Sequence, residues 1–225
     1  YYGMLNHAYR FRHDRCIVEK RSGVGVMDKF GLEIIPYIYD NIAPNSYWSP
    51  AYYRATYNNQ EGVLALNGTE IIPCIYDDID TWLTTDNFMV KSGKLKGLYT
   101  PRGKVIVPCE YTKISRWRET SLIHVKIDDQ EGLYSPEGQE ILPCQFIICK
   151  ELNGISLINR GGFSKNGKVQ NGIWGAINKE GKIIVPCKYN DITPYAGSER
   201  IEADGGYIKD IYDFNGNYLR SEYKW

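Results

Sequence analysis

Three residues recur along this chain at a fixed spacing: a glycine, a second glycine six positions later, and a proline eleven positions after the first. Successive prolines lie 37, 35, 35 and 43 positions apart, a period typical of repeat proteins whose units bury apolar surface against their neighbours. We therefore predict a tandem repeat in which these glycines and prolines are structural. The five sets are Gly25, Gly31 and Pro36; Gly62, Gly68 and Pro73; Gly97, Gly103 and Pro108; Gly132, Gly138 and Pro143; and Gly175, Gly181 and Pro186.

The segment around each second glycine predicts a β-hairpin. In the second set a short apolar stretch, 62–66, leads into Asn67-Gly68, and the apolar pair Ile71 and Ile72 follows. A glycine at the end of such a turn can take the positive φ that closes a three-residue loop. The proline that follows has no N–H to donate to a strand ladder, so it should end the pairing, sit at a bulge or lie on an edge.

An aromatic side chain stands three positions after each proline, and an isoleucine stands six positions after four of the five prolines. We expect both to anchor the core of a unit, with each tyrosine hydroxyl bonded to a backbone group or to water. The aromatics are Tyr39, Tyr76, Tyr111, Phe146 and Tyr189, and the isoleucines are Ile42, Ile79, Ile114 and Ile192.

The predicted fold class is all-β. The many tyrosines, and the clusters of Ile and Val bounded by Gly and Pro, favour strands. A short strand before the first glycine, such as Phe88–Lys91, gives three strands per unit. Apolar pairs such as Val63-Leu64 imply strands covered on both faces. We predict three-stranded antiparallel β-meanders of about 35 residues stacked as an open superhelical array. A closed propeller-like ring is the alternative, less favoured because propeller blades usually carry four strands.

We predict a single repeat domain over residues 1–225. An N-terminal strand or cap covers 1–20, and a degenerate C-terminal hairpin covers 206–225, where Asp210 and Ser221 replace the first glycine and the proline. The five repeats between them are expected at 21–57, 58–92, 93–127, 128–170 and 171–205.

Composition excludes some partner classes. Lys and Arg together number 27, as do Asp and Glu, so no net charge attracts the chain to nucleic acid or to an anionic membrane. No apolar run approaches about 18 residues, so no membrane span is predicted. The chain starts at Tyr1, and we expect a processed protein or an excised fragment. The sequence does not give the location of the protein in the cell, although the unpaired cysteines favour the cytoplasm.

Residues 174–192, WGAINKEGKIIVPCKYNDI, resemble the WG repeat, also called the KWG repeat, of bacterial proteins. The shared pattern is Trp-Gly, a Gly-closed turn, two aliphatic residues, Pro, then Tyr-Asp and an aliphatic residue, and it recurs from about Arg21 to Asn217. Only Trp174 keeps the eponymous tryptophan. The resemblance implies a repeat module without intrinsic catalysis that is associated with protein interaction. Repeats two, three and four carry Glu61, Lys96 and Glu131 in place of the tryptophan.

The cysteines do not predict a metal site, and we predict neither a metal nor a cofactor. Four of them directly follow the repeat prolines, at a spacing of 35 or more that fits no zinc motif. We expect free, buried thiols that act as small apolar side chains. These cysteines are Cys74, Cys109, Cys144 and Cys187.

No repeated set of residues predicts catalysis. The three histidines share no repeat position, and a group of aspartates follows the repeat aromatics. We expect these aspartates to accept hydrogen bonds from turn amides rather than to line a groove. The histidines are His7, His13 and His124, and the aspartates are Asp40, Asp77, Asp78 and Asp191.

Two features set the units apart from one another. The segment 159–172, NRGGFSKNGKVQNG, lengthens the last interval by eight residues, and we expect a mobile β-hairpin extension rather than a phosphate loop, since no helix follows it. The positions nine residues after the prolines include Trp82, Trp117 and Tyr195. These residues are expected either to form a row of partner anchors or to cap the core of each unit. With Trp174, they are the candidate binding residues. Asn45 and Leu152 occupy the same position in the other two repeats, and we call these five positions the aromatic row.

We predict a non-enzymatic interaction module that binds a protein partner in an effector- or immunity-associated role. The alternative is a cell-surface protein that binds carbohydrate through Trp82, Trp117 and Tyr195, which exposed rings would favour and buried rings would contradict. An enzyme is a third hypothesis, which no set of acid, base and nucleophile supports. Function is expected where units differ: the residue before the first glycine, the aromatic row and the insertion.

Overall fold

The computed structural model describes residues 5–8, 14–45, 51–82 and 86–224. The chain divides into two compact units, Tyr1–Cys109 and Glu110–Trp225, which are described separately. The described residues form antiparallel strands and one 3-10 turn, Ala196–Ser198, with no α-helix and no sheet closed into a barrel. None of these residues belongs to a helix long and apolar enough to cross a membrane.

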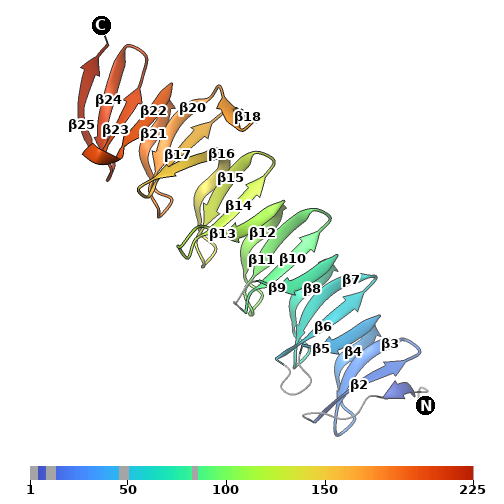
Figure 1. Ribbon diagram of the computed structural model, residues 1–225. Helices are drawn as coiled ribbons and strands as arrows, with labels where there is room; N and C mark the ends of the chain where they lie inside the picture. Colours follow the sequence, from blue (N-terminus) through green and yellow to red (C-terminus); the bar gives the residue numbers. More distant parts are fainter. Residues whose placement is uncertain (1–4, 9–13, 46–50, 83–85, 225) are drawn as a thin grey trace. The chain divides into compact units, whose positions relative to one another are not determined.

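The strands of the first unit form four-stranded meanders (Figure 1), in the orders β1-β2-β3-β4, β5-β6-β7-β8 and β9-β10-β11-β12. The last strand, β12, runs across the boundary between the two units. The strands are β1 (Leu5–Ala8), β2 (Arg15–Lys20), β3 (Gly23–Asp28), β4 (Glu33–Tyr39), β5 (Asn41–Pro44), β6 (Tyr52–Tyr57), β7 (Gln60–Ala65), β8 (Glu70–Tyr76), β9 (Asp78–Thr81), β10 (Phe88–Ser92), β11 (Leu95–Tyr99) and β12 (Val105–Tyr111).

The second unit contains a seven-stranded sheet, β13-β14-β15-β16-β17-β20-β21, a two-stranded sheet, β18-β19, and a four-stranded sheet, β22-β23-β24-β25. The long strand β16 pairs with β15 through its first half and with β17 through its second half, so it serves two meanders. The strands are β13 (Lys113–Arg116), β14 (Ile123–Ile127), β15 (Gln130–Tyr134), β16 (Glu140–Leu152), β17 (Ile155–Arg160), β18 (Phe163–Lys165), β19 (Lys168–Gln170), β20 (Ile173–Ile177), β21 (Ile183–Tyr189), β22 (Asp191–Tyr195), β23 (Arg200–Asp204), β24 (Ile208–Asp213) and β25 (Tyr218–Tyr223).

The prediction of three strands per unit is wrong, because each meander has four. The additional strand is the short first one, such as β5 or β9, which begins two residues after the repeat aromatic and holds the recurring isoleucine, for example Ile79, in the core. A strand of four residues with one buried apolar side chain carries too little alternation to be recognised. Since propeller blades usually carry four strands, the count no longer favours an open array over a ring.

The two glycines of each repeat have different physical roles. The second glycine has a positive φ, as Gly68 does at 86°, and its N–H donates to the carbonyl of Ala65 at 2.9 Å, which confirms the predicted turn. The first glycine lies within a strand. Residues 73–75 of β8 bulge opposite Gly62, where a Cβ would lie 2.7 Å from the carbonyl oxygen of Ile72. The first glycine is therefore required by the bulge at the proline.

Successive residues on the central strands face different cores, as the paired apolar residues predicted. Leu64 of β7 packs with Val26 and Ile35 of the preceding meander, whereas Val63 packs with Phe88 and Val90 of the following one. In the second unit Ile177 and Ala176 divide in the same way between two cores. Each of these cores is shared by two consecutive meanders.

Pairs of tyrosine hydroxyls recur between meanders. The hydroxyls of Tyr76 and Tyr99 lie 2.7 Å apart, and equivalent contacts join Tyr111 to Tyr134 at 2.9 Å and Tyr189 to Tyr212 at 2.6 Å. Burial raises the pKa of Tyr76, Tyr111 and Tyr189 above the usual 10.0, and the hydrogen bond to the partner hydroxyl raises it further.

These tyrosines predict that the chain loses stability in alkali. Above about pH 10 the unfolded chain releases phenolic protons that the folded chain keeps, so the free energy of unfolding falls as the pH rises. Urea unfolding between about pH 8 and pH 11 measures this fall. A variant with Tyr76→Phe, Tyr111→Phe and Tyr189→Phe should lose less stability over the same range, and an unchanged loss would contradict the assignment.

Candidate functional site

The tryptophans of the aromatic row do not form an exposed binding surface. Trp82 and Trp117 are only 8% and 6% exposed, and Tyr195 is 41% exposed. Backbone bonds from Trp82 and Trp117 close the loops after β9 and β13, and the Arg118 guanidinium covers the Trp117 ring at 4.3 Å. The two indoles therefore cap the cores, and they lack the free face that stacking on a sugar ring requires.

The thiols after the repeat prolines pack against the first glycines. A Cβ added to Gly62 would lie 2.6 Å from Sγ of Cys74, and burial raises the pKa of Cys74 to about 11. Such a thiol is a poor nucleophile at neutral pH. Cys144, Cys149 and Cys187 are also free and half-buried. Within the described part of the chain, no three His, Cys, Asp or Glu side chains are grouped to hold a metal ion.

Two of the four aspartates after the repeat aromatics, Asp40 and Asp77, accept hydrogen bonds from turn amides as expected, whereas Asp78 forms ion pairs with Lys91 and Arg54. The Asp40 carboxylate accepts a hydrogen bond from the Asn59 amide at 3.2 Å, and the Asp77 carboxylate accepts one from the Gly93 amide at 2.6 Å. These side chains end the fourth strand of one meander and fix the start of the next.

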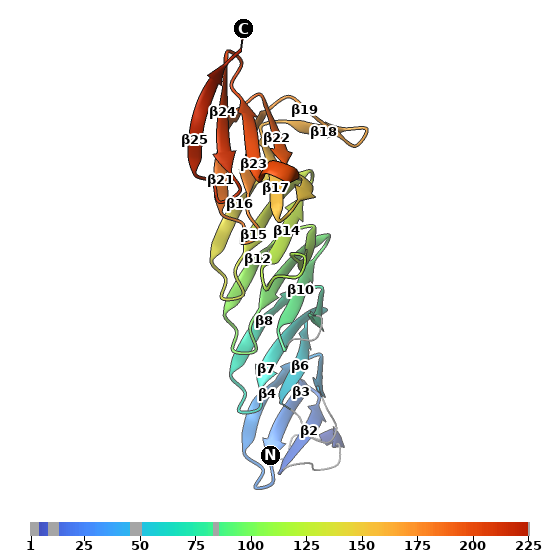
Figure 2. The same ribbon diagram turned by 60° about the vertical axis from the view of Figure 1, so that its left-hand side comes forward.

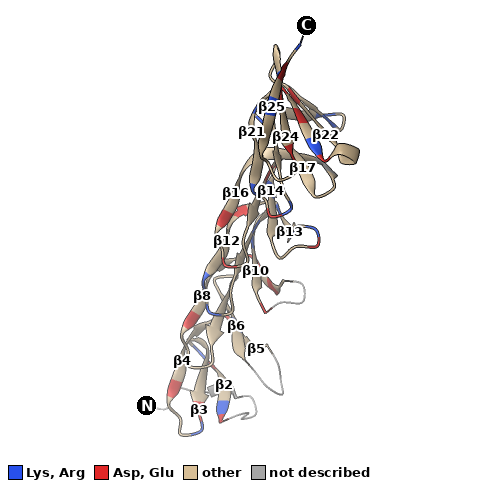
Figure 3. Cartoon of the chain, turned by 90° about the vertical axis from the view of Figure 1, so that its left-hand side faces the viewer, with Lys and Arg blue, Asp and Glu red and all other residues tan. Residues whose placement is uncertain are grey.

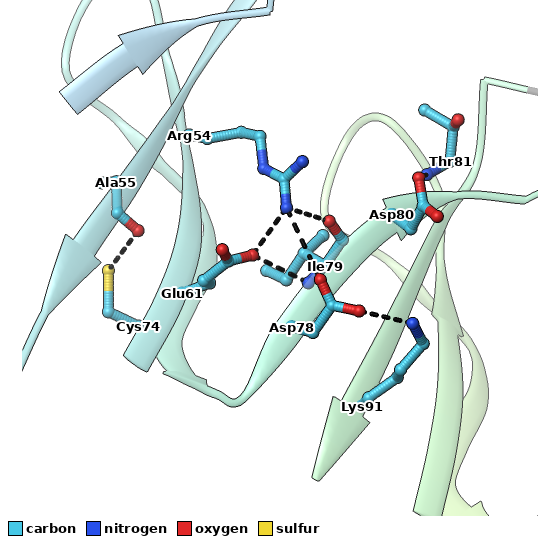
Figure 4. Close-up of polar contacts among 9 residues, drawn as sticks. All are labelled: Arg54, Ala55, Glu61, Cys74, Asp78, Ile79, Asp80, Thr81 and Lys91. Carbon is cyan, nitrogen blue, oxygen red and sulfur yellow. Dashed lines mark hydrogen bonds and ion pairs between the residues drawn. The ribbon is translucent and has the colours of Figure 1, made fainter. Parts of the chain in front are cut away.

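A polar contact joins neighbouring meanders in the first unit. Glu61, the residue before a first glycine, accepts hydrogen bonds from the Ile79 amide at 2.9 Å and from Arg54 at 2.7 Å. Arg54 also donates to the Ile79 carbonyl (Figure 4) and lies 3.8 Å from Asp78, which pairs with Lys91. The side chains of Arg54 and Glu61 thus satisfy the backbone at the edge of β9.

The corresponding residues of the fourth meander, His124 and Glu131, also bond to one another. His124 Nε2 lies 2.7 Å from Glu131 Oε2, and Ser115 Oγ lies 3.3 Å from His124 Nδ1. Lys126 completes the group at 3.6 Å from Glu131. The position of Ile79 in the next meander is occupied by the smaller Cys149. His13 lies outside the described residues, and only the backbone of His7 is described.

The insertion is a hairpin, as expected, and its base is fixed. Asn159 is fully buried, donates to the Asn171 carbonyl at 3.0 Å and accepts from the Gly162 amide at 3.0 Å. The hairpin β18–β19 projects from the strands β17 and β20 (Figure 2), and its residues are largely exposed.

A groove of about 530 Å³ lies between the fourth meander, the second half of β16 and the insertion hairpin. We call it the Trp174 groove. It brings together two sequence-predicted features, Trp174 and the insertion, with Glu131. The apolar residues of β16 and β17 in its lining were not predicted. Its lining residues are Lys126, Asp129, Glu131, Ile147, Ile148, Cys149, Leu157, Ser164, Gly167, Lys168, Val169 and Trp174.

The Trp174 groove combines an apolar floor with charges of both signs. Half-buried Leu157 and Trp174 supply apolar surface, and the exposed Asp129 and Lys168 stand on its rim without an ion-pair partner among the described residues. Such a mixture suits a segment with apolar and charged side chains. Residues of both charges are also interspersed along the described parts of each unit (Figure 3).

A second groove of about 790 Å³ lies near the loop after Trp117. Its charged residues include Lys179 and Glu180, which lie 3.8 Å apart as an exposed pair. It holds none of the candidate aromatic residues. Its lining is Arg118, Glu119, Thr120, Ser121, Leu122, Gly154, Lys179 and Glu180.

A family model described as "WG containing repeat" matches residues 66–91, 97–130 and 174–199. The chain contains WG repeats. The third match begins at Trp174, the tryptophan that lies in the Trp174 groove, and the matches begin in the second, third and fifth of the predicted repeats. No curated protein matches the sequence.

Several solved structures resemble the chain weakly. The CNH domain of AfRom2 is 12% identical with a TM-score of 0.28, and the match covers 97% of this chain and 84% of that one. Hsv2 of Kluyveromyces lactis is 11% identical with a TM-score of 0.27, over 93% and 60%. BamB of Moraxella catarrhalis is 12% identical with a TM-score of 0.26, over 94% and 73%. TM-scores this low do not establish a common architecture for the WG repeats.

Proposed function

We propose that this chain is a non-catalytic WG-repeat module that binds a segment of a protein partner in the Trp174 groove. The single observation that carries the proposal is the coincidence of departures from the repeat pattern at this place. Trp174, the insertion and Cys149 all depart from the neighbouring repeats, and all contribute to the lining of one groove. Residues that only maintain the repeats would be expected to recur in every unit.

The chemistry of the groove specifies the segment it would take. An apolar side chain would cover Trp174 and Leu157, since a partly exposed tryptophan beside aliphatic residues is a typical anchor for a binding partner. Asp129 would attract a basic residue, and Lys168 an acidic residue. The proposed ligand is therefore an extended peptide with basic, apolar and acidic residues.

Selection of random twelve-residue peptides displayed on phage tests this proposal. We expect the recovered peptides to share the basic, apolar and acidic pattern. Trp174→Ala should weaken binding about 30-fold because it removes the anchor, and Lys168→Glu should weaken it about 10-fold because it reverses one charge. Isothermal titration calorimetry with a synthetic peptide of the recovered pattern measures both effects.

The matched control is Lys179→Glu, which makes the same charge reversal at an exposed lysine outside the Trp174 groove. The affinity of this variant for the peptide should remain within about twofold of that of the parent chain. A charge outside the Trp174 groove is screened by salt and interacts little with a peptide bound in the groove. Peptides that bind the Trp174→Ala chain as tightly as the parent would refute the groove as the binding site.

We also propose that the meanders form one repeat domain, stacked as an open array rather than a closed ring. The cores within each unit support the stacking of consecutive meanders, since each core is shared by two of them. Small-angle X-ray scattering of the whole chain would distinguish the two arrangements, since a ring of this mass has the smaller radius of gyration.

A further inference from the structure

The outer strands of the WG repeats are protected against pairing with another chain. In four described ladders the strand that carries the repeat proline shifts register opposite the first glycine, which places a bulge on the last strand of the meander. Prolines and bulges on edge strands prevent continued pairing, because they remove an N–H donor and distort the edge.

The last strand of the chain, β25, has lost this protection. Asp210 and Ser221 replace the glycine and the proline, and they face one another in a ladder that runs in register from Ile208–Tyr223 to Ile211–Arg220; the register shifts beyond it, at Leu219, which has no partner on β24. The Ser221 hydroxyl donates to Asp210 at 2.5 Å. Strand β25 ends its sheet, and all six of its residues are exposed. Residues 220–223 therefore present a regular edge with backbone groups available for another strand.

We propose that β25 pairs in an antiparallel direction with β25 of a second copy of this chain, about a two-fold axis at Ser221. In this register Arg220 of each copy faces Glu222 of the other. Arg220 and Glu222 lie on one face of the strand, 2.7 Å apart at their closest atoms.

The occupant is a second copy because the strand is complementary to itself. Opposite charges that face one another across antiparallel strands stabilise the pair, and like charges destabilise it. A two-fold axis at Ser221 pairs both charges of each copy. Since one short strand buries less than the roughly 1,200 Å² of a typical stable interface, the dimer is weak and depends on concentration.

Sedimentation velocity of the whole chain at concentrations up to about 1 mM, where an association of about 4 kcal/mol becomes visible, tests the proposal. The parent chain should shift from monomer to dimer. Arg220→Glu and Glu222→Arg should each remain monomeric, because each places like charges opposite one another. An equimolar mixture of the two single variants should dimerise again, since two carboxylates of one copy then face two guanidinium groups of the other.

The double variant Arg220→Glu/Glu222→Arg should also dimerise, because it exchanges both charges and keeps the complementarity. Ser221→Pro should abolish dimerisation by restoring the proline of the other repeats, and circular dichroism checks that each variant is folded. A parent chain that stays monomeric throughout would overturn the proposal, and so would a mixture of single variants that fails to associate. A parent chain that stays monomeric is also the result expected if the edge of β25 pairs only with a strand of a different protein.

Discussion

Gly175→Ala is expected to lower the free energy of unfolding by about 3 kcal/mol. The added Cβ would lie 2.7 Å from the carbonyl oxygen of Val185 and 2.5 Å from Sγ of Cys187. One neighbour is backbone, so the bulge at Pro186 must shift to make room. Chemical denaturation of the parent and the variant, with their midpoints and slopes compared, measures the cost.

Gly197→Ala is the matched control, because a Cβ at Gly197 meets nothing within 4 Å. We expect this change to alter the free energy of unfolding by less than about 0.5 kcal/mol. Equal effects of the two substitutions would show that the first glycine of the repeat is not required by the bulge.

The second large effect is expected at Leu64, which is 1% exposed. Leu64→Ala should cost about 3 kcal/mol, because it removes a buried side chain from the core shared with Val26 and Ile35. Combined with Ile35→Val, which lies in the same core, the cost should depart from the sum of the single changes.

Combined with Ile72→Val, the cost should be additive within about 0.5 kcal/mol. Ile72 lies on the neighbouring strand but belongs to the core that contains Phe88. Double-mutant cycles in urea measure both couplings. A coupling of Leu64 to Ile72 as large as that to Ile35 would contradict the assignment of Leu64 and Ile72 to two separate cores.

Much of the repeat could be predicted because its signals are local. The positive φ of Gly68 follows from the turn, and the bulge at Pro73 follows from a missing N–H. The four-residue strands were missed because each holds one buried residue, and the place of the first glycine could not be explained without the bulge opposite it. The burial of Trp117 depends on how its loop folds over the core, which a fixed spacing does not determine.

The candidate site was only partly predictable. Trp174 and the insertion departed visibly from the repeat, so the sequence marked both. The contact between His124 and Glu131 crosses two strands, and it needed the register that pairs Lys126 with Glu131. The sequence signal for the floor of the groove was weak: at 147–149, Ile-Ile-Cys replaces the two polar residues and the isoleucine found in the other repeats.

Hydrogen–deuterium exchange of the chain with and without a phage-selected peptide tests most directly whether the Trp174 groove is the binding site. A bound segment should slow exchange of the amides that line the groove, at residues 147–149 and 163–174, and leave those of the first unit unchanged. Protection centred on the loop after Trp117, or on strands far from Trp174, would contradict the account.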